Sequence, residues 1–519
     1  MQPTLGQLSG ADLMNEYMAY DPRADLKAFT SVPTEDWLKM GEARALEAFR
    51  LASQAVPAYK DFLRKHSVNP EKIQSIQDFK SLPETTKENY FECYPLSSVV
   101  VGGDLSAATV IHYSSGSSGR SFYWPKSVLQ DINGYKGTEL LLTQYFDADT
   151  VPTLALNCLS MGAWAAGELV HASIKAMASK GRPITVMSPG LSIDLFCRLF
   201  TDLAPCFEQV ILVGYPSFLR VQLQEACARG IEFRPDRTKI WTGGEGFSEP
   251  WREYMAARLN CSEPYKLVSS VLGTSETGLT GMSTPFCDYL RILLYQKGLS
   301  ATLFSDVRLL PCVIQYLPAA KYIEILDGEI VVTCGGLVPL IRYGTKDRGV
   351  ALTPAEILSR LPGHVRGQLE SLRETCGIPN LPVLAIYGRS DASVFFYAAS
   401  IYPDQIADAL TDPDAEPWLT GRFVVSSQED DTADQYLQLT VELKSGACPS
   451  PTLEPELRQV VSCALERTSP EYASILGSIG EKAKVRVELR EYNPEQFLLP
   501  SGKAATTERK GRASGGPAA

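Results

Sequence analysis

The chain lacks the signatures of several protein classes. Its twelve cysteines never form a Cys-x-x-Cys pair, and its four histidines (His66, His112, His171 and His364) lie far apart. Neither residue type follows the spacing of a zinc ligand set. No apolar run approaches the roughly 18 residues of a membrane-spanning helix, and no signal peptide is recognisable. We therefore expect free thiols and a cytoplasmic location.

Positive charge is also scarce. The 49 lysines and arginines face 60 acidic residues, and the formal net charge is −11. This balance argues against a general nucleic-acid or anionic membrane surface, so neither is expected as a partner. With 45% hydrophobic and 21% charged residues, the composition is that of a soluble globular protein. A length of 519 residues predicts two or three domains. A homodimer is compatible with these properties.

The pattern of apolar residues predicts an α/β fold. The first 25 residues have mixed polarity and predict a loose lead-in, whereas residues 34–66 carry apolar positions at helical spacing. From about residue 108 to 345, short β-rich runs alternate with amphipathic stretches, which is typical of a largely parallel sheet. Residues 329–333 and 340–343 predict a pair of late strands in a small barrel-like unit.

One segment between positions 112 and 120 concentrates the groups that bind polyphosphate. It reads His112-Tyr113-Ser114-Ser115-Gly116-Ser117-Ser118-Gly119-Arg120 and follows an apolar run. Backbone N–H groups, small hydroxyls and one permanent cation suit a phosphate chain. The segment is not a Gly-x-x-x-x-Gly-Lys-Ser/Thr loop, because no lysine follows the second glycine. Taken alone, it is better interpreted as a flexible connection.

Five further motifs follow in order. They are Gly243-Gly244-Glu245, Gly273-Thr274-Ser275-Glu276-Thr277-Gly278, Arg342-Tyr343-Gly344-Thr345-Lys346-Asp347, Gly388-Arg389-Ser390-Asp391 and Pro500-Ser501-Gly502-Lys503. With the serine-glycine segment, their order and spacing resemble the adenylate-forming superfamily, which makes acyl-AMP from ATP and a carboxylic acid. The stretch from Val56-Pro57-Ala58-Tyr59 through Leu82-Pro83-Glu84-Thr85-Thr86-Lys87-Glu88 resembles the phenylacetate–coenzyme A ligase branch, which favours aromatic acids.

The resemblance implies an α/β fold with two unequal parts. Residues 1–387 would form a large multi-subdomain adenylation domain with mainly parallel sheets and a helical lead-in to about residue 100. Residues 388–391 would form a hinge, and residues 392–503 a small mobile α+β lid. Residues 504–519 are predicted to be disordered from their composition.

The resemblance also implies a role for each motif. The loop from Ser114 to Arg120 would close over the β- and γ-phosphates of ATP. Glu276 would hold Mg²⁺, which commonly binds one carboxylate and substrate phosphates, and Lys503 would bridge the acid and the α-phosphate. These last two are the predicted catalytic residues. The remaining expected contacts are with adenine or its surroundings (Gly243, Gly244, Glu245, Gly273, Thr274, Ser275), ribose or phosphate (Asp347, Arg389), the hinge rotation (Asp391) and the acyl pocket (Trp164, Tyr215).

The chain departs from the family at three points. Leu272 replaces the usual aromatic residue before Gly273, and Lys346 stands where relatives have glycine before the aspartate. Tyr397-Ala398 replaces an Arg-Gly pair that lines the pantetheine tunnel, which would narrow that tunnel. Some relatives bind zinc after the Mg²⁺ motif; Cys287 is present there, but no histidine follows it within reach, so no zinc is expected.

These departures leave the acceptor open. Transfer of the acyl group to coenzyme A is the family default. Transfer to an amine or to a carrier-protein thiol is the alternative. A non-catalytic nucleotide or acyl-adenylate binder is a third interpretation, which requires Lys503 or Glu276 to be idle.

Overall fold

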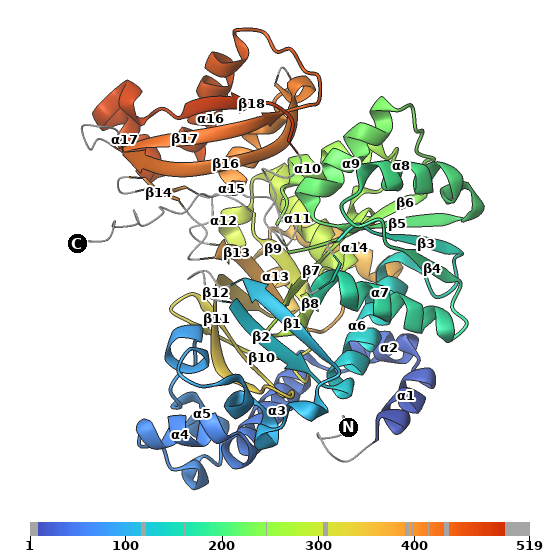
Figure 1. Ribbon diagram of the computed structural model, residues 1–519, viewed down its shortest axis with the longest axis vertical. Helices are drawn as coiled ribbons and strands as arrows, with labels where there is room; N and C mark the ends of the chain where they lie inside the picture. The colour runs from blue at the N-terminus through green and yellow to red at the C-terminus, as the bar shows by residue number, and fades with distance from the viewer. Residues whose placement is uncertain are drawn as a thin grey trace, which may run out of the picture.

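A computed structural model describes most of the chain (Figure 1). The described residues are 9–115, 121–159, 161–162, 165–244, 246–304, 310–389, 394–396, 399–401, 403–413, 415–429 and 435–493. The blue N-terminal helices lie at one end of the molecule and the orange-red C-terminal part at the other. Among the described residues, none of the helices combines the length and apolar character that crossing a membrane requires.

The N-terminal segment is helical rather than loose, so the expected lead-in was wrong from residue 10 onward. Helix α1 (Gly10–Met18) begins with a capping box from Ser9, and α2 (Pro22–Ser31) begins with proline after an Asp21 cap. Leu13 and Tyr17 are buried against Ile132 of the later helix α6 (Val128–Phe146). This long-range burial stabilises a segment that is too short and too polar to be stable alone. The following helices are α3 (Thr34–Ala55), α4 (Pro57–Lys65) and α5 (Ile76–Lys80).

An eleven-stranded sheet forms the centre of the described chain, in the order β10-β11-β12-β13-β9-β8-β7-β6-β5-β3-β4. One half is parallel and consists of β3 (Thr153–Asn157), β4 (Ile184–Met187), β5 (Gln209–Gly214), β6 (Thr238–Gly243) and β7 (Val268–Thr274). The other half is antiparallel and consists of β8 (Gly278–Met282), β9 (Cys312–Gln315), β10 (Tyr322–Leu326), β11 (Glu329–Cys334), β12 (Leu340–Leu352) and β13 (Val383–Arg389).

Helices cover both faces of the parallel half, as its alternating burial requires. Leu154 of β3 and Leu212 of β5 belong to one core, whereas Ala155 and Ile211, one position away, belong to another. This alternation follows from the two-residue period of a strand, and both faces must be apolar when both are covered. The covering helices are α6 (Val128–Phe146), α7 (Ala165–Ser179), α8 (Ile193–Asp202), α9 (Pro216–Ala228) and α10 (Glu249–Arg258).

The predicted late strands exist as β11 and β12, which pair antiparallel. They do not form a separate barrel-like unit, because β12 pairs on its other side with β13 and thereby joins the central sheet. The helices around this half are α11 (Pro285–Lys297), α12 (Ser300–Leu303), α13 (Pro354–Arg360) and α14 (Gly363–Cys376). A two-stranded hairpin, β1 (Val110–Ser115) and β2 (Ser121–Lys126), lies over the sheet near β7 and β8 (Figure 1).

The C-terminal part has its own hydrophobic core, whose buried members run from Val394 to Val487. Strand β17 (Gln435–Leu443) pairs antiparallel with β16 (Leu419–Glu429) and parallel with β18 (Arg486–Arg490). The remaining elements are β14 (Val394–Phe396), β15 (Ala399–Ile401), α15 (Pro403–Ala407), α16 (Leu453–Thr468) and α17 (Pro470–Ile479). A large α/β part and a small α+β part confirm the predicted fold class.

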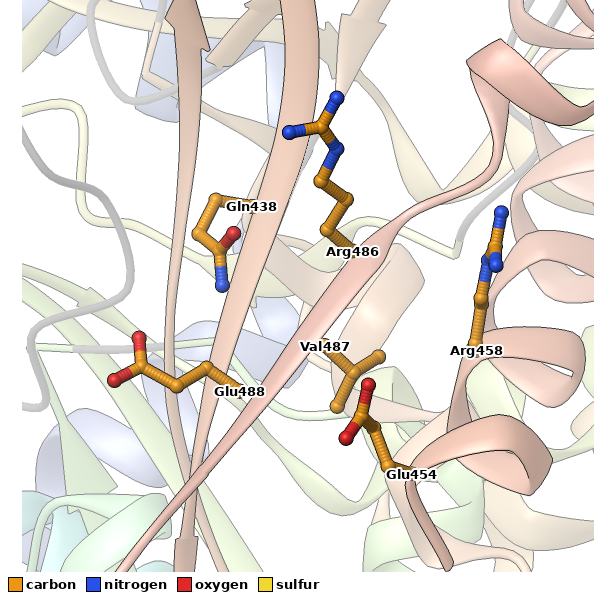
Figure 2. Close-up of a pocket in the computed structure, with 6 residues that line it drawn as sticks. All are labelled: Gln438, Glu454, Arg458, Arg486, Val487 and Glu488. Carbon is orange, nitrogen blue, oxygen red and sulfur yellow. The ribbon is translucent and has the colours of Figure 1, made fainter. Parts of the chain in front are cut away.

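A polar hollow of about 550 Å³ lies in the C-terminal part, between its sheet and α16 (Figure 2). Arg486 stacks on Tyr436, with its guanidinium carbon 3.7 Å from the ring centroid. Arg458 pairs with Glu481 at 3.4 Å. The hollow contains none of the residues predicted for the site.

Candidate functional site

The candidate site lies where parallel strands end. Strand β6 ends at Gly243 and its neighbour β7 at Thr274, and Tyr215 follows the end of β5. Carboxyl ends of parallel strands meet at one edge of a sheet, which is the usual binding edge of α/β proteins. A side chain at Gly243 would place a Cβ 2.9 Å from the Val271 side chain of β7, so any other residue would force Val271 to shift. Gly244 has φ +80°, which also favours glycine.

A tight turn between β7 and β8 carries Glu276. Thr274 accepts a hydrogen bond from the backbone N–H of Thr277 at 3.1 Å, and Gly278 turns the chain with φ +66°. Gly273 pairs with Leu279 at a register shift in the hairpin. Gly273 and Thr274 therefore shape the turn that carries Glu276, and the predicted contact of Gly273, Thr274 and Ser275 with ATP stays a prediction.

Glu276 is held as a carboxylate by a lysine from the N-terminal region. Its Oε1 lies 2.7 Å from Nζ of Lys87, and the Glu276 side chain is only 10% exposed. Burial raises the pKa of the Glu276 carboxyl, but the charge of Lys87 and its hydrogen bond outweigh burial and hold that pKa below its ordinary value. The Lys87 ammonium also lies 5.3 Å from the centroid of the Phe122 ring on β2.

Two further lysines bind the backbone of the same turn. Lys126 donates to the Glu276 carbonyl at 2.7 Å, and Lys321 donates to the Thr277 carbonyl at 2.5 Å. Burial, reinforced by the charge of Lys321, lowers the pKa of Lys126 to about 8. Three ammonium groups thus gather around one turn of a protein whose net charge is negative. A polyanion would be attracted to this point.

The hairpin β1–β2 brings the serine-glycine segment to the same region. Backbone pairing of Ser114 with Phe122 and of Ser115 with Ser121 leaves residues 116–120 as the connection between the two strands. That connection, from Gly116 to Arg120, lies outside the described residues. Its anchor is nevertheless close to Glu276, because Phe122 contacts Lys87 and Lys126 ends β2 at the turn.

Asp347 and Arg389 are brought opposite each other. They are paired across β12 and β13, although 42 positions separate them in the sequence (389 − 347). The Asp347 side chain is buried, and its backbone N–H donates to Thr345 Oγ1 at 3.1 Å. A buried carboxylate has two oxygens that accept hydrogen bonds from vicinal hydroxyls. The two residues predicted to contact ribose thus share one site on the sheet.

The segment that carries Lys87 is tied to the strand that carries Asp347. The Thr85 backbone N–H donates to the Arg342 carbonyl, and the Gly344 N–H donates to the Thr85 carbonyl, both at 3.0 Å. Lys346 also pairs with Glu88 through their side chains. Lys346 has φ +64°, a conformation that favours glycine. The backbone of Lys346 is left-handed despite its side chain.

The predicted residues outside this description are Gly116, Ser117, Ser118, Gly119, Arg120, Trp164, Glu245, Asp391 and Lys503. Tyr215 is described; it is buried in the core shared with Phe218 and Trp241. Cys287 is also buried in a core, where burial raises the pKa of its thiol to about 12. Among the described residues, no group of three or more histidine, cysteine or acidic side chains could hold a metal ion.

The sequence reasoning missed Lys87, Lys126 and Lys321 as site residues. Lys87 stands inside the N-terminal signature, so its position could have suggested a role. Lys126 and Lys321 belong to no motif, and they reach the turn from 150 and 44 residues away. Such contacts are visible only in the folded chain.

The chain is similar to known ligases over nearly its whole length. It is 22% identical over 495 residues to the phenylacetate-coenzyme A ligase of Thermus thermophilus, which covers 95% of this chain and 97% of that protein. No protein-family model matches the chain. The predicted resemblance to the phenylacetate–coenzyme A ligase branch is therefore confirmed by a relative rather than by a family model.

Solved structures show the same fold. 2-Hydroxyisobutyryl-CoA ligase in its postadenylation state, in complex with an acyl-AMP, superposes with a TM-score of 0.66 at 15% identity, covering 93% of this chain and 91% of that chain. The same ligase in the thioesterification state, with acyl-AMP and CoA, gives a TM-score of 0.54 at 16% identity, covering 93% and 92%. Of these two structures of that ligase, the postadenylation one superposes better on this chain.

Proposed function

We propose that the protein is an acid–thiol ligase that consumes ATP, activates a carboxylic acid as its adenylate and transfers the acyl group to a thiol. The observation that carries this proposal is the Glu276 carboxylate. It is buried, kept ionised by Lys87 and placed at the carboxyl end of β7, next to the anchor of a serine-glycine loop. The similarity to acid–CoA ligases over 95% of the chain supports the same activity.

The charges of the site suit a magnesium-bound triphosphate. The chain contributes one ionised carboxylate, and Mg²⁺ commonly binds one or two carboxylates together with substrate phosphates and water. Glu276 would hold that ion, and the ion would offset charge on the phosphates. Lys87 pairs with Glu276 in the structure. Once Glu276 held Mg²⁺, the ammonium of Lys87 would be free to turn toward the phosphates. Ser114, Ser115 and the loop to Arg120 would close over the β- and γ-phosphates.

The adenosine half of ATP would lie along the strand ends. Gly243, Gly244 and Glu245 would flank adenine, where the missing side chains of the glycines allow close approach. Asp347 would accept hydrogen bonds from the ribose hydroxyls, and Arg389 would contact ribose or phosphate. Their pairing across β12 and β13 supports this assignment.

The acid and the lid complete the proposal. Tyr215 would form an apolar wall of the acid pocket, together with Trp164, and the acid would be aromatic. Lys503 would reach the α-phosphate from the lid and stabilise the charge that develops as the acid attacks, while Asp391 would absorb the hinge rotation. The acceptor would be coenzyme A. An amide ligase or a carrier-protein acylating enzyme is the alternative, motivated by Tyr397-Ala398.

ATP–pyrophosphate exchange, screened over aromatic and aliphatic carboxylic acids, tests the activity. We expect exchange with at least one acid and a loss of about 100-fold in Glu276→Gln, because the metal ligand loses its charge. Glu263→Gln is a matched control, since Glu263 forms a surface pair with Lys266. The absence of exchange with every acid would contradict an adenylating enzyme. Once exchange is found with an acid, product analysis with coenzyme A, a carrier-protein thiol or an amine separates the possible acceptors.

A further inference from the structure

One carboxylate lies where the C-terminal part meets the larger N-terminal part, which ends with β13 and is called the body below. The side chain of Glu416, just before β16, is 16% exposed and contacts residues of helices α9 and α10. Its Oε1 has five polar or cationic neighbours: Gln224 at 3.2 Å, Tyr254 at 3.2 Å, Lys444 at 3.6 Å, Arg258 at 3.8 Å and Arg220 at 4.0 Å. Four of these five belong to the body, and only Lys444 belongs to the C-terminal part.

The four body residues form a prepared receptor for this carboxylate. Arg220 and Gln224 are four positions apart on α9, and Tyr254 and Arg258 are four positions apart on α10, so each pair shares one helix face. The guanidinium carbons of Arg220 and Arg258 lie 4.7 Å and 5.1 Å from the centroid of the Tyr254 ring. Both cations are thereby held in place by an aromatic ring.

The backbone of the C-terminal part is fitted to Arg220. Gly421 of β16 has φ +82°, and a Cβ at this position would lie 3.2 Å from the Arg220 guanidinium. A larger residue would be strained by this φ and would require the guanidinium to shift by a few tenths of an ångström. The side chain of Arg220 is only 6% exposed as a result.

The contact also has a free-energy cost, which favours its opening. Nε and Nη2 of Arg220 are buried and have no hydrogen-bond partner among the described residues. A buried guanidinium with incomplete hydrogen bonds loses hydration that one ion pair at 4.0 Å offsets only in part. Water would restore these bonds once β16 moved away. The carboxylate of Glu416 therefore stabilises the interface, whereas the incompletely hydrogen-bonded guanidinium of Arg220 destabilises it.

We propose that Glu416 is a positioning residue that latches the C-terminal lid in the orientation used for adenylate formation, and that the latch opens for acyl transfer. This inference rests on the proposed function. The better superposition on the postadenylation state than on the thioesterification state, with TM-scores of 0.66 and 0.54, favours a latched form that precedes acyl transfer. The latch supplies no group to the reaction and acts by biasing the lid between two orientations.

The test compares wild type with Glu416→Gln, which keeps the size of the side chain and removes its charge. Glu481→Gln is the control, because Glu481 pairs with Arg458 and Lys484 within the C-terminal part itself. Arg258→Gln removes the more exposed partner and should reproduce the effect in weaker form. Hydrogen exchange at α9 and at the start of β16 reports latch opening without any need for activity.

We expect faster exchange at both segments in Glu416→Gln. Pyrophosphate exchange should fall about tenfold, the size of a lost partly buried charge pair, while transfer from preformed acyl-adenylate to thiol is retained or raised. Hydrogen exchange equal to wild type would overturn the latch, and so would faster hydrogen exchange with both half-reactions unchanged or equally reduced. If wild type formed no adenylate at all, the proposed function would fail, while hydrogen exchange would still decide whether Glu416 holds the interface.

Discussion

Replacing Lys87 with methionine is the most informative single perturbation of the site. Methionine keeps most of the length and apolar contact of lysine but removes the charge that faces Glu276 at 2.7 Å. Glu276 would then be a buried carboxylate without its cation. Burial is the largest influence on its pKa and acts upward, so the pKa of Glu276 should move from below to above its ordinary value.

The size of the effect follows from the burial of the pair. Leaving one partner of a buried ion pair uncompensated costs about 3–5 kcal/mol. Because Glu276 is 10% and Lys87 15% exposed, water reaches the pair, and we expect about 2–3 kcal/mol of lost stability at neutral pH. If Lys87 also contacts phosphate during adenylation, pyrophosphate exchange should fall about 100-fold or more. Lys87→Arg keeps the charge and should retain most of the stability and most of the pyrophosphate exchange.

The stability of the wild type and that of Lys87→Met should depend on pH with opposite sign. In wild type the folded-state pKa of Glu276 is lowered, so its ionisation contributes stability above the unfolded pKa, about 4.3, which is lost as pH falls through the folded pKa. In Lys87→Met the folded pKa is raised, so stability is instead lost as pH rises above about 4.3. The acid limb of the exchange rate should move to higher pH in this variant.

Two measurements test this reasoning: urea unfolding at several pH values and the pH profile of pyrophosphate exchange. The double variant Lys87→Met with Glu276→Gln removes the uncompensated charge and should regain stability relative to Lys87→Met, but not activity. The reasoning is refuted if the double variant is no more stable than the single one. It is equally refuted if Lys87→Met keeps the wild-type pH profile.

Three further predictions concern other lysines. Lys126 loses its proton above about pH 8 in the folded state but only near pH 10.5 in the unfolded state. Between these pH values the stability of the wild type should therefore rise with pH relative to that of Lys126→Met. Parallel pH profiles of urea unfolding for the two proteins would contradict this. Lys346→Gly should be about 1 kcal/mol more stable than Lys346→Ala in urea unfolding. Both variants lose the surface pair with Glu88, but only glycine adopts φ +64° without backbone strain. Equal stability of the two variants would exclude such strain. Lys503→Ala should cut pyrophosphate exchange about 100-fold and leave ATP binding by calorimetry unchanged, and normal exchange would remove this lysine from catalysis.

The motifs predicted local structure well wherever residues that are neighbours in the sequence form it. Glycines of the Gly273–Gly278 segment are recognisable from sequence because a tight turn needs them locally, and the structure has Gly278 at φ +66°. Alternating apolar runs likewise predicted the parallel strands, since strand burial has a period of two residues. The roles of Glu276, Asp347 and Lys503 in the reaction stay predictions.

The misjudged regions depend on distant contacts. The lead-in is helical because Leu13 and Tyr17 are buried against Ile132, more than a hundred residues later. The late strands join the central sheet because β12 pairs with β13, whose sequence lies some thirty residues further on. Composition of the local segment contains neither fact, because burial and strand pairing are decided by what the rest of the chain presents.

The sequence by itself determined the class of fold, the order of the motifs and the turn that carries Glu276, because turns, strand alternation and small residues are local properties. Only the tertiary structure decided the electrostatics. It placed Lys87, Lys126 and Lys321 around the Glu276 turn and brought Glu416 against Arg220 and Arg258. The energy of a charge depends on its distance from other charges and on its exposure to water, and the fold sets both.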